Sequence, residues 1–125
     1  MHREFDYVIV GAGTAGCVLA ARLSESGRYT VALLEAGGVD RNFWIHAPLG
    51  FGKLYDDPRY NWLYESQPEP GLLGAIQFLP RGRVLGGTGS INGMIHLRGH
   101  RADFAHWRDA GNPGWAYDEV LPYFL

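Results

Sequence analysis

The residues best placed to do chemistry in this chain are three glycines close to its start. Gly11, Gly13 and Gly16 form a G-x-G-x-x-G run, which predicts phosphate binding where it joins a strand to a helix. Gly11 allows a sharp turn, Gly13 lets a pyrophosphate approach the backbone, and Gly16 lets the helix pack closely on the strand. The helix start, at Thr14 and Ala15, then offers backbone amides and a hydroxyl group to the phosphates.

A carboxylate further along extends this prediction from a phosphate to a dinucleotide. Glu35 follows Gly11 by 24 residues, at the end of an apolar run. With Ala36 beside it, this carboxylate would accept hydrogen bonds from the ribose hydroxyls of an adenosine, and it would repel the 2′-phosphate of NADP. A glycine turn without a ligand and a solvated acid at a strand end are the alternatives. The motif by itself does not separate FAD from NAD.

The order of the expected elements indicates an α/β fold with a Rossmann-like βαβ unit. Residues 5–10 are β-rich and nearly continuous in apolar character, as in a parallel strand covered on both faces. Residues 15–26 show a helical period that ends near Gly27, and residues 30–34 give a second buried-strand pattern. Further along, we expect a short strand over 77–80, helical or irregular structure over 92–97, a helix over 101–110, and a last helix from a cap at Asp118 to Leu125.

A second glycine-rich run covers residues 81–94. It combines glycines that free backbone N–H groups, two arginines, hydroxyl groups at Thr88 and Ser90, and the side-chain amide of Asn92. As chemistry alone, such a loop suits an anionic or heteroaromatic ligand. A cluster of surface turns is the alternative. Binding of NAD would leave this second run unexplained, so its presence favours FAD.

The second run closely resembles the first sequence motif of the glucose-methanol-choline (GMC) oxidoreductases, in particular of their choline-dehydrogenase-like members. The resemblance extends over essentially the whole chain, through stretches at 34–38, 60–68, 97–99, 114–115 and 121–123. It implies a two-domain flavoprotein, with an FAD-binding domain assembled from separate segments and a substrate domain. It also implies a small alcohol as substrate, whose carbon passes a hydride to the flavin N5.

The same resemblance assigns residues of the second run to the flavin. The residues that would lie along the cofactor are Arg83, Val84, Gly86 and Gly87, and those that would run beneath or beside the isoalloxazine are Asn92, Gly93, Met94 and Ile95. Some relatives attach FAD through a histidine where this chain has Ile91, so the resemblance implies a non-covalent flavin. His96 and Gly89 depart from the family pattern, in place of an aromatic residue and a serine. The family's catalytic histidine and its partner lie near the carboxyl end of those proteins, so no catalytic residue is assigned in this chain.

These predictions divide the chain into three parts of one FAD-binding domain: a βαβ unit over 1–38, an aromatic-rich excursion over 39–80 and a second flavin-contacting segment over 81–125. Aromatic residues are too dense in the middle part for a disordered linker, so we expect them to pack on a neighbouring surface that includes parts not present here. The last residues, 120–125, are apolar and lack a closing glycine or a charged last turn. This pattern predicts an amino-terminal fragment that is inactive alone.

Composition argues against several other partners. The formal net charge is −2 and the charges are scattered, which argues against nucleic acid and against a polybasic membrane anchor. No apolar run approaches the ~20 residues of a membrane-spanning helix, and no secretion signal is visible. A single cysteine, Cys17, favours a reducing and therefore cytoplasmic location. His46, His100 and His106 lack metal-ligand spacing, so we expect no metal.

Three hypotheses follow for the intact protein. The first is an FAD-dependent alcohol dehydrogenase or oxidase of the GMC type. The second is an NAD-dependent dehydrogenase, which shares the βαβ unit. The third is a non-catalytic, truncated chain that keeps part of a nucleotide cleft. The first is favoured because it accounts for both glycine runs.

Overall fold

The computed structural model describes residues 3–125, which form two compact units. The first unit ends at Met94, and the second comprises Ile95–Leu125. The part expected over 81–125 is therefore divided between the units. The division falls where residues 93–100 form neither helix nor strand.

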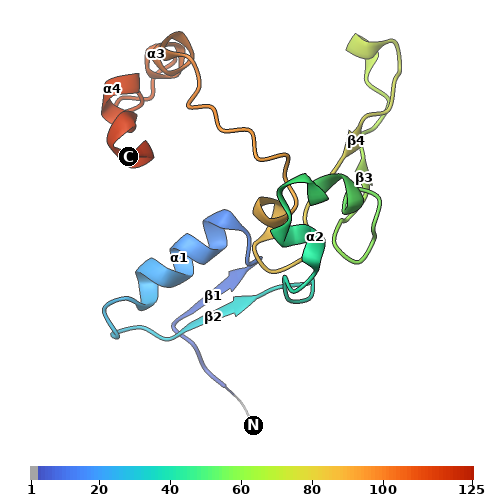
Figure 1. Ribbon diagram of the computed structural model, residues 1–125. Coiled ribbons are helices and arrows are strands. Elements are labelled where there is room, and N and C mark those ends of the chain that lie inside the picture. Colours follow the sequence, from blue (N-terminus) through green and yellow to red (C-terminus); the bar gives the residue numbers. More distant parts are fainter. Residues whose placement is uncertain (1–2) are drawn as a thin grey trace. The chain divides into compact units, whose positions relative to one another are not determined.

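The first unit begins with the expected βαβ arrangement (Figure 1). Strand β1 (Tyr7–Val10) and strand β2 (Val31–Leu34) pair in parallel, with Tyr7 opposite Val31 and Val10 opposite Leu34. Helix α1 (Thr14–Ser24) connects them and packs against both. The βαβ prediction is confirmed, and each strand is shorter than predicted.

Strand β1 is less covered than its sequence predicts. Among residues 3–125 it pairs only with β2, and Val8 and Val10 are exposed. The apolar pattern of a strand covered on both faces is thus not satisfied by this chain. The uncovered face is available to other segments or chains.

An antiparallel ribbon follows in the first unit. Strand β3 (Tyr64–Glu65) pairs with strand β4 (Phe78–Leu79), with Tyr64 opposite Leu79. The pairing continues in the same register to a bridge between Asn61 and Gly82. The strand expected over 77–80 is confirmed at its two central residues.

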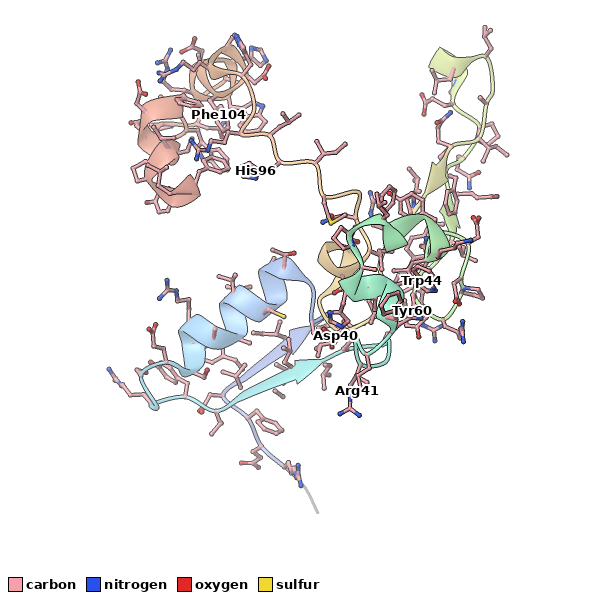
Figure 2. The ribbon with its side chains drawn as sticks, viewed as in Figure 1. Asp40, Arg41, Trp44, Tyr60, His96 and Phe104 are labelled. Carbon is pink, nitrogen blue, oxygen red and sulfur yellow. The ribbon has the colours of Figure 1, made fainter. Side chains whose placement is uncertain are left out.

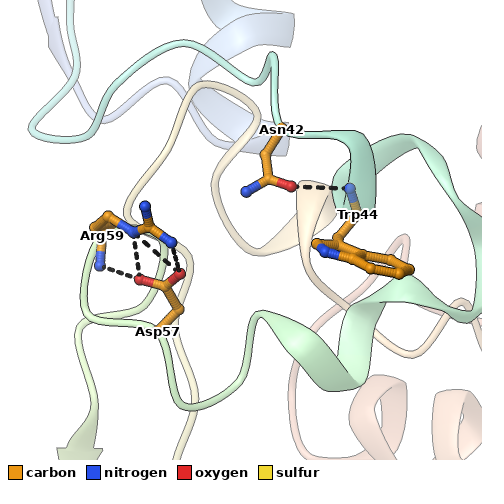
Figure 3. Close-up of polar contacts among 4 residues, drawn as sticks. All are labelled: Asn42, Trp44, Asp57 and Arg59. Carbon is orange, nitrogen blue, oxygen red and sulfur yellow. Dashed lines mark hydrogen bonds and ion pairs between the residues drawn. The ribbon is translucent and has the colours of Figure 1, made fainter.

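The core of the first unit is small and lies between the aromatic-rich part and the second glycine run. Leu54, Val84 and Ile91 are almost completely buried together, and Ile45 and Tyr60 pack against them. Around this core the chain turns frequently, in helix α2 (Phe43–His46) and in 3-10 helices at Pro48–Lys53, Pro70–Leu72 and Gly87–Ser90. The Asn42 side chain caps α2 by accepting a hydrogen bond from the Trp44 N–H (Figure 3). Residues before a proline disfavour the helical conformation, so α2 ends just before Pro48.

A charged turn leads into the ribbon. The Asp57 carboxylate accepts hydrogen bonds from the Arg59 backbone N–H at 2.9 Å and from its guanidinium at 2.6 Å (Figure 3). The next residues are fixed by Asn61, which is 1% exposed and whose Oδ1 accepts from the N–H groups of Leu63 and Arg81. The turn and the buried amide together set the direction in which the ribbon leaves the core.

Replacing Asp57 by asparagine is expected to give a pH-dependent loss of stability. Hydrogen bonds from the Arg59 side chain hold the pKa of Asp57 below its ordinary value of 3.8. A carboxyl group whose pKa is lowered by folding contributes its full stabilisation at pH values above its ordinary pKa. This contribution is lost as the pH falls through the lowered pKa. Denaturant unfolding should therefore show a constant gap between wild type and Asp57→Asn from about pH 7 to 5, closing below about pH 4. The exposed neighbour Asp56→Asn is the control. A gap that stays constant down to about pH 2 would contradict this explanation.

The second unit is a short helical hairpin around one aromatic ring. Helix α3 (Arg101–Asp109) is followed by helix α4 (Tyr117–Val120) and a 3-10 helix at Leu121–Phe124. Phe104 is 6% exposed and lies edge-on to Trp107, Tyr117 and Phe124 (Figure 2). The helix expected over 101–110 is confirmed.

The last helix is present over residues 117–124, but the expected cap at Asp118 is wrong. Helix α4 begins before Asp118, because the Glu119 carboxylate accepts the Ala116 N–H at 2.8 Å at the helix start. Asp118 instead pairs with Arg101 at 2.8 Å. Pro122 has no N–H to donate, and the chain continues as a 3-10 helix.

No helix within residues 3–125 is both long and apolar enough to cross a membrane.

Candidate functional site

The two glycine-rich bends touch each other. The Gly86 N–H donates a hydrogen bond to the Ala12 carbonyl at 2.8 Å, and Gly86 bridges Gly13 in parallel fashion. Gly87 is so close that a Cβ added to it would lie 2.7 Å from the Cα of Gly13. Real Cβ atoms do not approach that closely, so glycine at position 87 allows this contact. The two bends therefore come together within the first unit.

The backbone amides of Gly86 and Gly87 are not bare, contrary to expectation. The N–H groups of Gly86 and Gly87 both donate to carbonyls, those of Ala12 and Val84. The positive φ angles of the two glycines, 91° and 58°, curl the chain back on itself and bring these donors to internal acceptors. The second bend thus supports the first bend instead of forming a separate nest of amides.

The hydroxyl groups of the second run also have internal partners. Thr88 Oγ1 accepts a hydrogen bond from the Gly82 N–H at 3.0 Å, and Ser90 Oγ donates to the Leu85 carbonyl at 2.9 Å. The expectation that these hydroxyls are available to a ligand is not met for Ser90. Thr88 still lines the cleft that the bends enclose.

A cleft of about 570 Å³ opens at the joined bends. Three parts of the chain line this cleft: the end of β1 with the first bend, the end of β2, and the ribbon with the second bend. The lining residues are, in that order, Val10, Gly11 and Gly13; Leu34, Glu35 and Ala36; and Trp62, Tyr64, Arg81, Gly82, Gly87 and Thr88. Gly13 is also the N-cap of α1, and no side chain caps that helix. Amides at an uncapped helix start attract anions.

The Glu35 carboxylate connects the first bend to the segment that follows β2. Its Oε2 accepts the Ala12 N–H at 2.8 Å, and its Oε1 accepts the Gly37 N–H at 2.9 Å. Each carboxylate oxygen can accept more than one hydrogen bond, so capacity for a ribose hydroxyl remains. Glu35 therefore positions the first bend in addition to the ribose contact that its sequence position predicts.

Comparison with known proteins decides the family. A sequence model of the GMC oxidoreductases matches residues 5–125. The chain belongs to the GMC oxidoreductase family. Among curated GMC relatives, an oxygen-dependent choline dehydrogenase of Photobacterium profundum is 52% identical over 124 residues, and one of Rhizobium rhizogenes is 50% identical over 121 residues. These alignments cover 99% and 97% of this chain and 22% of each relative.

Solved structures give the same family. Pyridoxine 4-oxidase from Mesorbium loti is 40% identical with a TM-score of 0.86, over 97% of this chain and 24% of that chain. A formate oxidase is 35% identical with a TM-score of 0.83, over 95% of this chain and 21% of that chain. The family resemblance read from the glycine runs is confirmed. The chain spans 22% of the length of the curated relatives described above, which agrees with the expectation of a fragment.

Several residues predicted to contact the cofactor lie at the cleft or behind it. Gly11, Gly13, Glu35, Ala36 and Gly87 line the cleft. The other predicted residues of the first glycine run are at the start of α1, where Thr14 and Ala15 are exposed and Gly16 is buried. A Cβ on Gly16 would overlap the Gly11 carbonyl oxygen, as expected for close packing of helix and strand.

Other predicted residues lie away from the cleft. Val84 is 0% exposed within the core, so it supports the second bend and cannot itself line the cleft. The Arg83 guanidinium carbon lies 5.0 Å from the centroid of the Trp62 ring, and Arg83 does not line the cleft. Asn92 Oδ1 accepts the Met94 N–H at 2.7 Å, in a turn in which Met94 has a positive φ of 58°. Gly93 is partly buried in the same turn. Ile95 is 84% exposed and belongs to the second unit.

Sequence reasoning missed three side chains at the cleft. Trp62 and Tyr64 were expected to pack on a neighbouring surface with the other aromatic residues of 39–80, and they were part of the family resemblance, but they had no assigned cofactor role. Arg81 entered as one of the two arginines of the second run. A usable signal was present, because Tyr60, Trp62 and Tyr64 alternate with other residues as in a strand. What the sequence does not reveal is that this strand pairs with the start of the second glycine run.

Two of the histidines have local structural partners. Within residues 3–125, no group of three or more possible metal ligands is present. His46 Nε2 lies 2.6 Å from the Asp40 carbonyl oxygen, and His100 Nδ1 accepts the Ala102 N–H at the start of α3. These two rings have local structural partners.

Replacing Glu35 by alanine is expected to destabilise the first unit by about 2 kcal/mol, because the N–H of Ala12 is left buried without a partner. Ala12 is 1% exposed. Denaturant unfolding of the purified protein measures the effect, with the exposed Glu65→Ala as a matched control that should change stability by less than about 0.5 kcal/mol. Equal stability of the two variants would show that Glu35 has no positioning role.

Proposed function

We propose that this chain forms the amino-terminal part of the FAD-binding domain in an FAD-dependent oxidoreductase that acts on CH–OH groups. The single observation that supports this most is the contact between the two glycine bends at a cleft that also holds Glu35. A βαβ turn alone fits any dinucleotide. The additional bend, joined to the first and belonging to the GMC motif, favours FAD over NAD.

The residues present fit the adenosine diphosphate portion of FAD. Gly13 has no side chain between the cleft and the uncapped start of α1, so a pyrophosphate can approach the helix amides. Glu35 stands at the end of β2, at the place of a ribose carboxylate. The cleft volume of about 570 Å³ is typical for a cofactor site.

When bound, FAD supplies the redox chemistry by accepting a hydride from the alcohol carbon. The proposed work of this chain is to bind and orient the cofactor. The helix start and Gly13 hold the pyrophosphate, Glu35 holds the ribose, and the second bend fixes the position of the first. No residue of this chain is proposed as the base that takes the alcohol proton.

We further propose that the flavin is bound without a covalent link. The position at which some relatives carry a histidine is Ile91, which is 1% exposed and packs with Leu54 and Val84. An aliphatic side chain in the core has no nucleophilic atom to bond to the flavin. Acid denaturation of the yellow protein, followed by filtration, should release all the FAD into the filtrate. Flavin retained with the polypeptide would contradict this proposal.

The substrate is proposed to be a small alcohol. Curated relatives are named choline dehydrogenases, and similar structures are a pyridoxine 4-oxidase and a formate oxidase. Choline and pyridoxine both carry an alcohol group, so the class of CH–OH donor is the level at which these two names support a proposal. We also place the protein in the cytoplasm and propose no nucleic-acid partner, on the single cysteine and the scattered charges.

The test is to purify the protein encoded by the complete reading frame in the presence of FAD. The proposal predicts a flavin absorbance spectrum that bleaches when an alcohol such as choline, pyridoxine or benzyl alcohol is added without oxygen. A colourless protein that binds NAD more tightly than FAD would favour the NAD-dependent dehydrogenase. A reading frame that stops after Leu125, with no flavin bound, would favour a non-catalytic chain.

A further inference from the structure

One wall of the cleft is formed by side chains that the βαβ motif does not explain. The ribbon pairs Trp62 with Arg81, since the Trp62 N–H donates to the Arg81 carbonyl at 2.9 Å and Asn61 bridges Gly82. Residues two apart on a strand share a face. Trp62, Tyr64 and Arg81 all line the cleft, on the side contributed by the ribbon. We call Trp62 and Tyr64 the aromatic wall.

The aromatic wall is held in place before any ligand binds. The rings of Trp62 and Tyr64 stack with centroids 5.8 Å apart and planes inclined by only 5°. The Arg83 guanidinium carbon lies 5.0 Å from the Trp62 ring centroid, within the range of a cation–π contact. Behind the rings, the buried Asn61 side chain fixes the backbone on both sides of the ribbon. Such preorganisation reduces the entropy lost on binding.

The rings nevertheless keep free surface. Trp62 is 40% exposed and Tyr64 is 49% exposed although both line the cleft. Flat, exposed aromatic faces are the surfaces on which nucleobases stack. A planar heteroaromatic ring is therefore the ligand chemistry that the aromatic wall fits.

Arg81 brings the positive charge to the same cleft. Among the described residues that line it, Arg81 is the one cation and Glu35 the one anion. Arg83 lies against the Trp62 ring, and Arg81 Nη1 donates a hydrogen bond to the Pro80 carbonyl at 2.7 Å. The other N–H groups of the Arg81 guanidinium keep donor capacity for a ligand. An arginine in the lining of a cleft that also includes the uncapped start of α1 suits the pyrophosphate that the helix start attracts.

We infer that Trp62 and Tyr64 form the platform for the adenine ring of the dinucleotide, and that Arg81 pairs with its pyrophosphate. This inference rests on the proposed function, because it uses the same cleft. Adenine is assigned in preference to the isoalloxazine because Glu35 and Ala36, at the ribose end of the βαβ site, line the cleft with the aromatic wall.

The experiment uses the protein from the complete reading frame, freed of flavin and titrated calorimetrically with FAD, ADP, adenosine and FMN. Trp62→Leu and Tyr64→Leu should each lower the affinity for FAD, ADP and adenosine by about tenfold, which corresponds to one lost stacking contact. The affinity for FMN should stay unchanged. Arg81→Gln should lower the affinity for FAD and ADP by about tenfold or more and leave the affinity for adenosine unchanged.

Trp44→Leu is the matched control. Trp44 is 43% exposed, close to the exposure of Trp62, belongs to the same unit and does not line the cleft (Figure 2). Its ligand affinities should equal those of wild type. Trp62→Phe and Arg81→Lys, with circular dichroism melting curves, separate a lost contact from misfolding. These two conservative variants should have the melting temperature of wild type, and they should lose less ligand affinity than the leucine and glutamine variants.

The possible outcomes separate the inference from the proposed function. If wild type binds FAD and ADP while folded Trp62 and Arg81 variants bind them equally well, the inference is overturned and the proposed function stands. If the Trp62 and Tyr64 variants lose affinity for FMN and keep their affinity for adenosine, the adenine assignment is overturned. If wild type binds neither FAD nor ADP, the proposed function fails, and the inference fails with it.

Discussion

Gly13→Ala is expected to lower FAD affinity by about 100-fold or more while the fold is kept. The backbone at Gly13 has φ −80° and ψ −173°, which any residue adopts. A Cβ there would meet only the Cα of Gly87, at an ordinary 3.8 Å. The added methyl group would therefore fit the protein, but it would occupy the side from which a pyrophosphate reaches the start of α1.

Two measurements check this expectation together: FAD affinity by fluorescence titration and the unfolding free energy by denaturant. Stability should change by less than about 1 kcal/mol, because an alanine N-cap costs a few tenths and replacing glycine recovers a similar amount. Gly52→Ala is the control, since a Cβ there meets no atom within 4 Å and Gly52 is not among the residues that line the cleft. Wild-type FAD affinity in a folded Gly13→Ala protein would refute the assignment of Gly13 to the pyrophosphate.

Gly87→Ala is expected to affect both fold and ligand. Gly87 has a φ of 58°, and its Cβ would lie 2.7 Å from the Cα of Gly13. The left-handed conformation costs an alanine about 1–2 kcal/mol, and the forced separation of two backbones adds about 1–3 kcal/mol. We expect a loss of about 3 kcal/mol in unfolding free energy and no detectable FAD at micromolar concentration.

Gly38→Ala is the matched control for this variant. Gly38 also lies at a contact between the βαβ unit and the second run, where it bridges Val84, but a Cβ there meets nothing within 4 Å. Its stability should stay within about 0.5 kcal/mol of wild type. Should Gly87→Ala behave like Gly38→Ala, the contact between the bends would have no role in fold or binding.

The parts predicted well from sequence are those that local chemistry determines. Gly11 and Gly13 lie between β1 and α1, and Gly16 lies in the first turn of α1. Each glycine of such a run has a steric reason that depends on its immediate neighbours. The family was predictable for the same reason, because several short motifs occur in the correct order. The position of Glu35 at a strand end follows from the apolar run before it.

The parts predicted poorly depend on contacts between distant segments. Arg81 reaches the cleft because its segment pairs with Trp62, and no local pattern around either residue gives that register. The amides of Gly86 and Gly87 were expected to be bare, but their positive φ angles direct them to internal carbonyls. Asp118 was expected to cap a helix because aspartate is a good N-cap, whereas Glu119 provides the carboxylate that reaches back to the helix start.

Several apolar faces of this chain are uncovered within residues 3–125. Val8 and Val10 of β1 are uncovered, and Tyr123 and Leu125 of the second unit are 90% and 86% exposed. Apolar residues of this kind are normally covered by partner elements. Studies of binding should therefore use the protein from the complete reading frame.

The central claim is that one FAD molecule lies at the cleft where the two glycine bends touch. A crystal structure of the protein from the complete reading frame, grown with FAD, tests it most directly. The account predicts the pyrophosphate at the start of α1 beside Gly13 and Gly87, with the adenosine ribose on Glu35. A pyrophosphate bound elsewhere, with Gly13 and Gly87 in contact only with each other, would contradict the account.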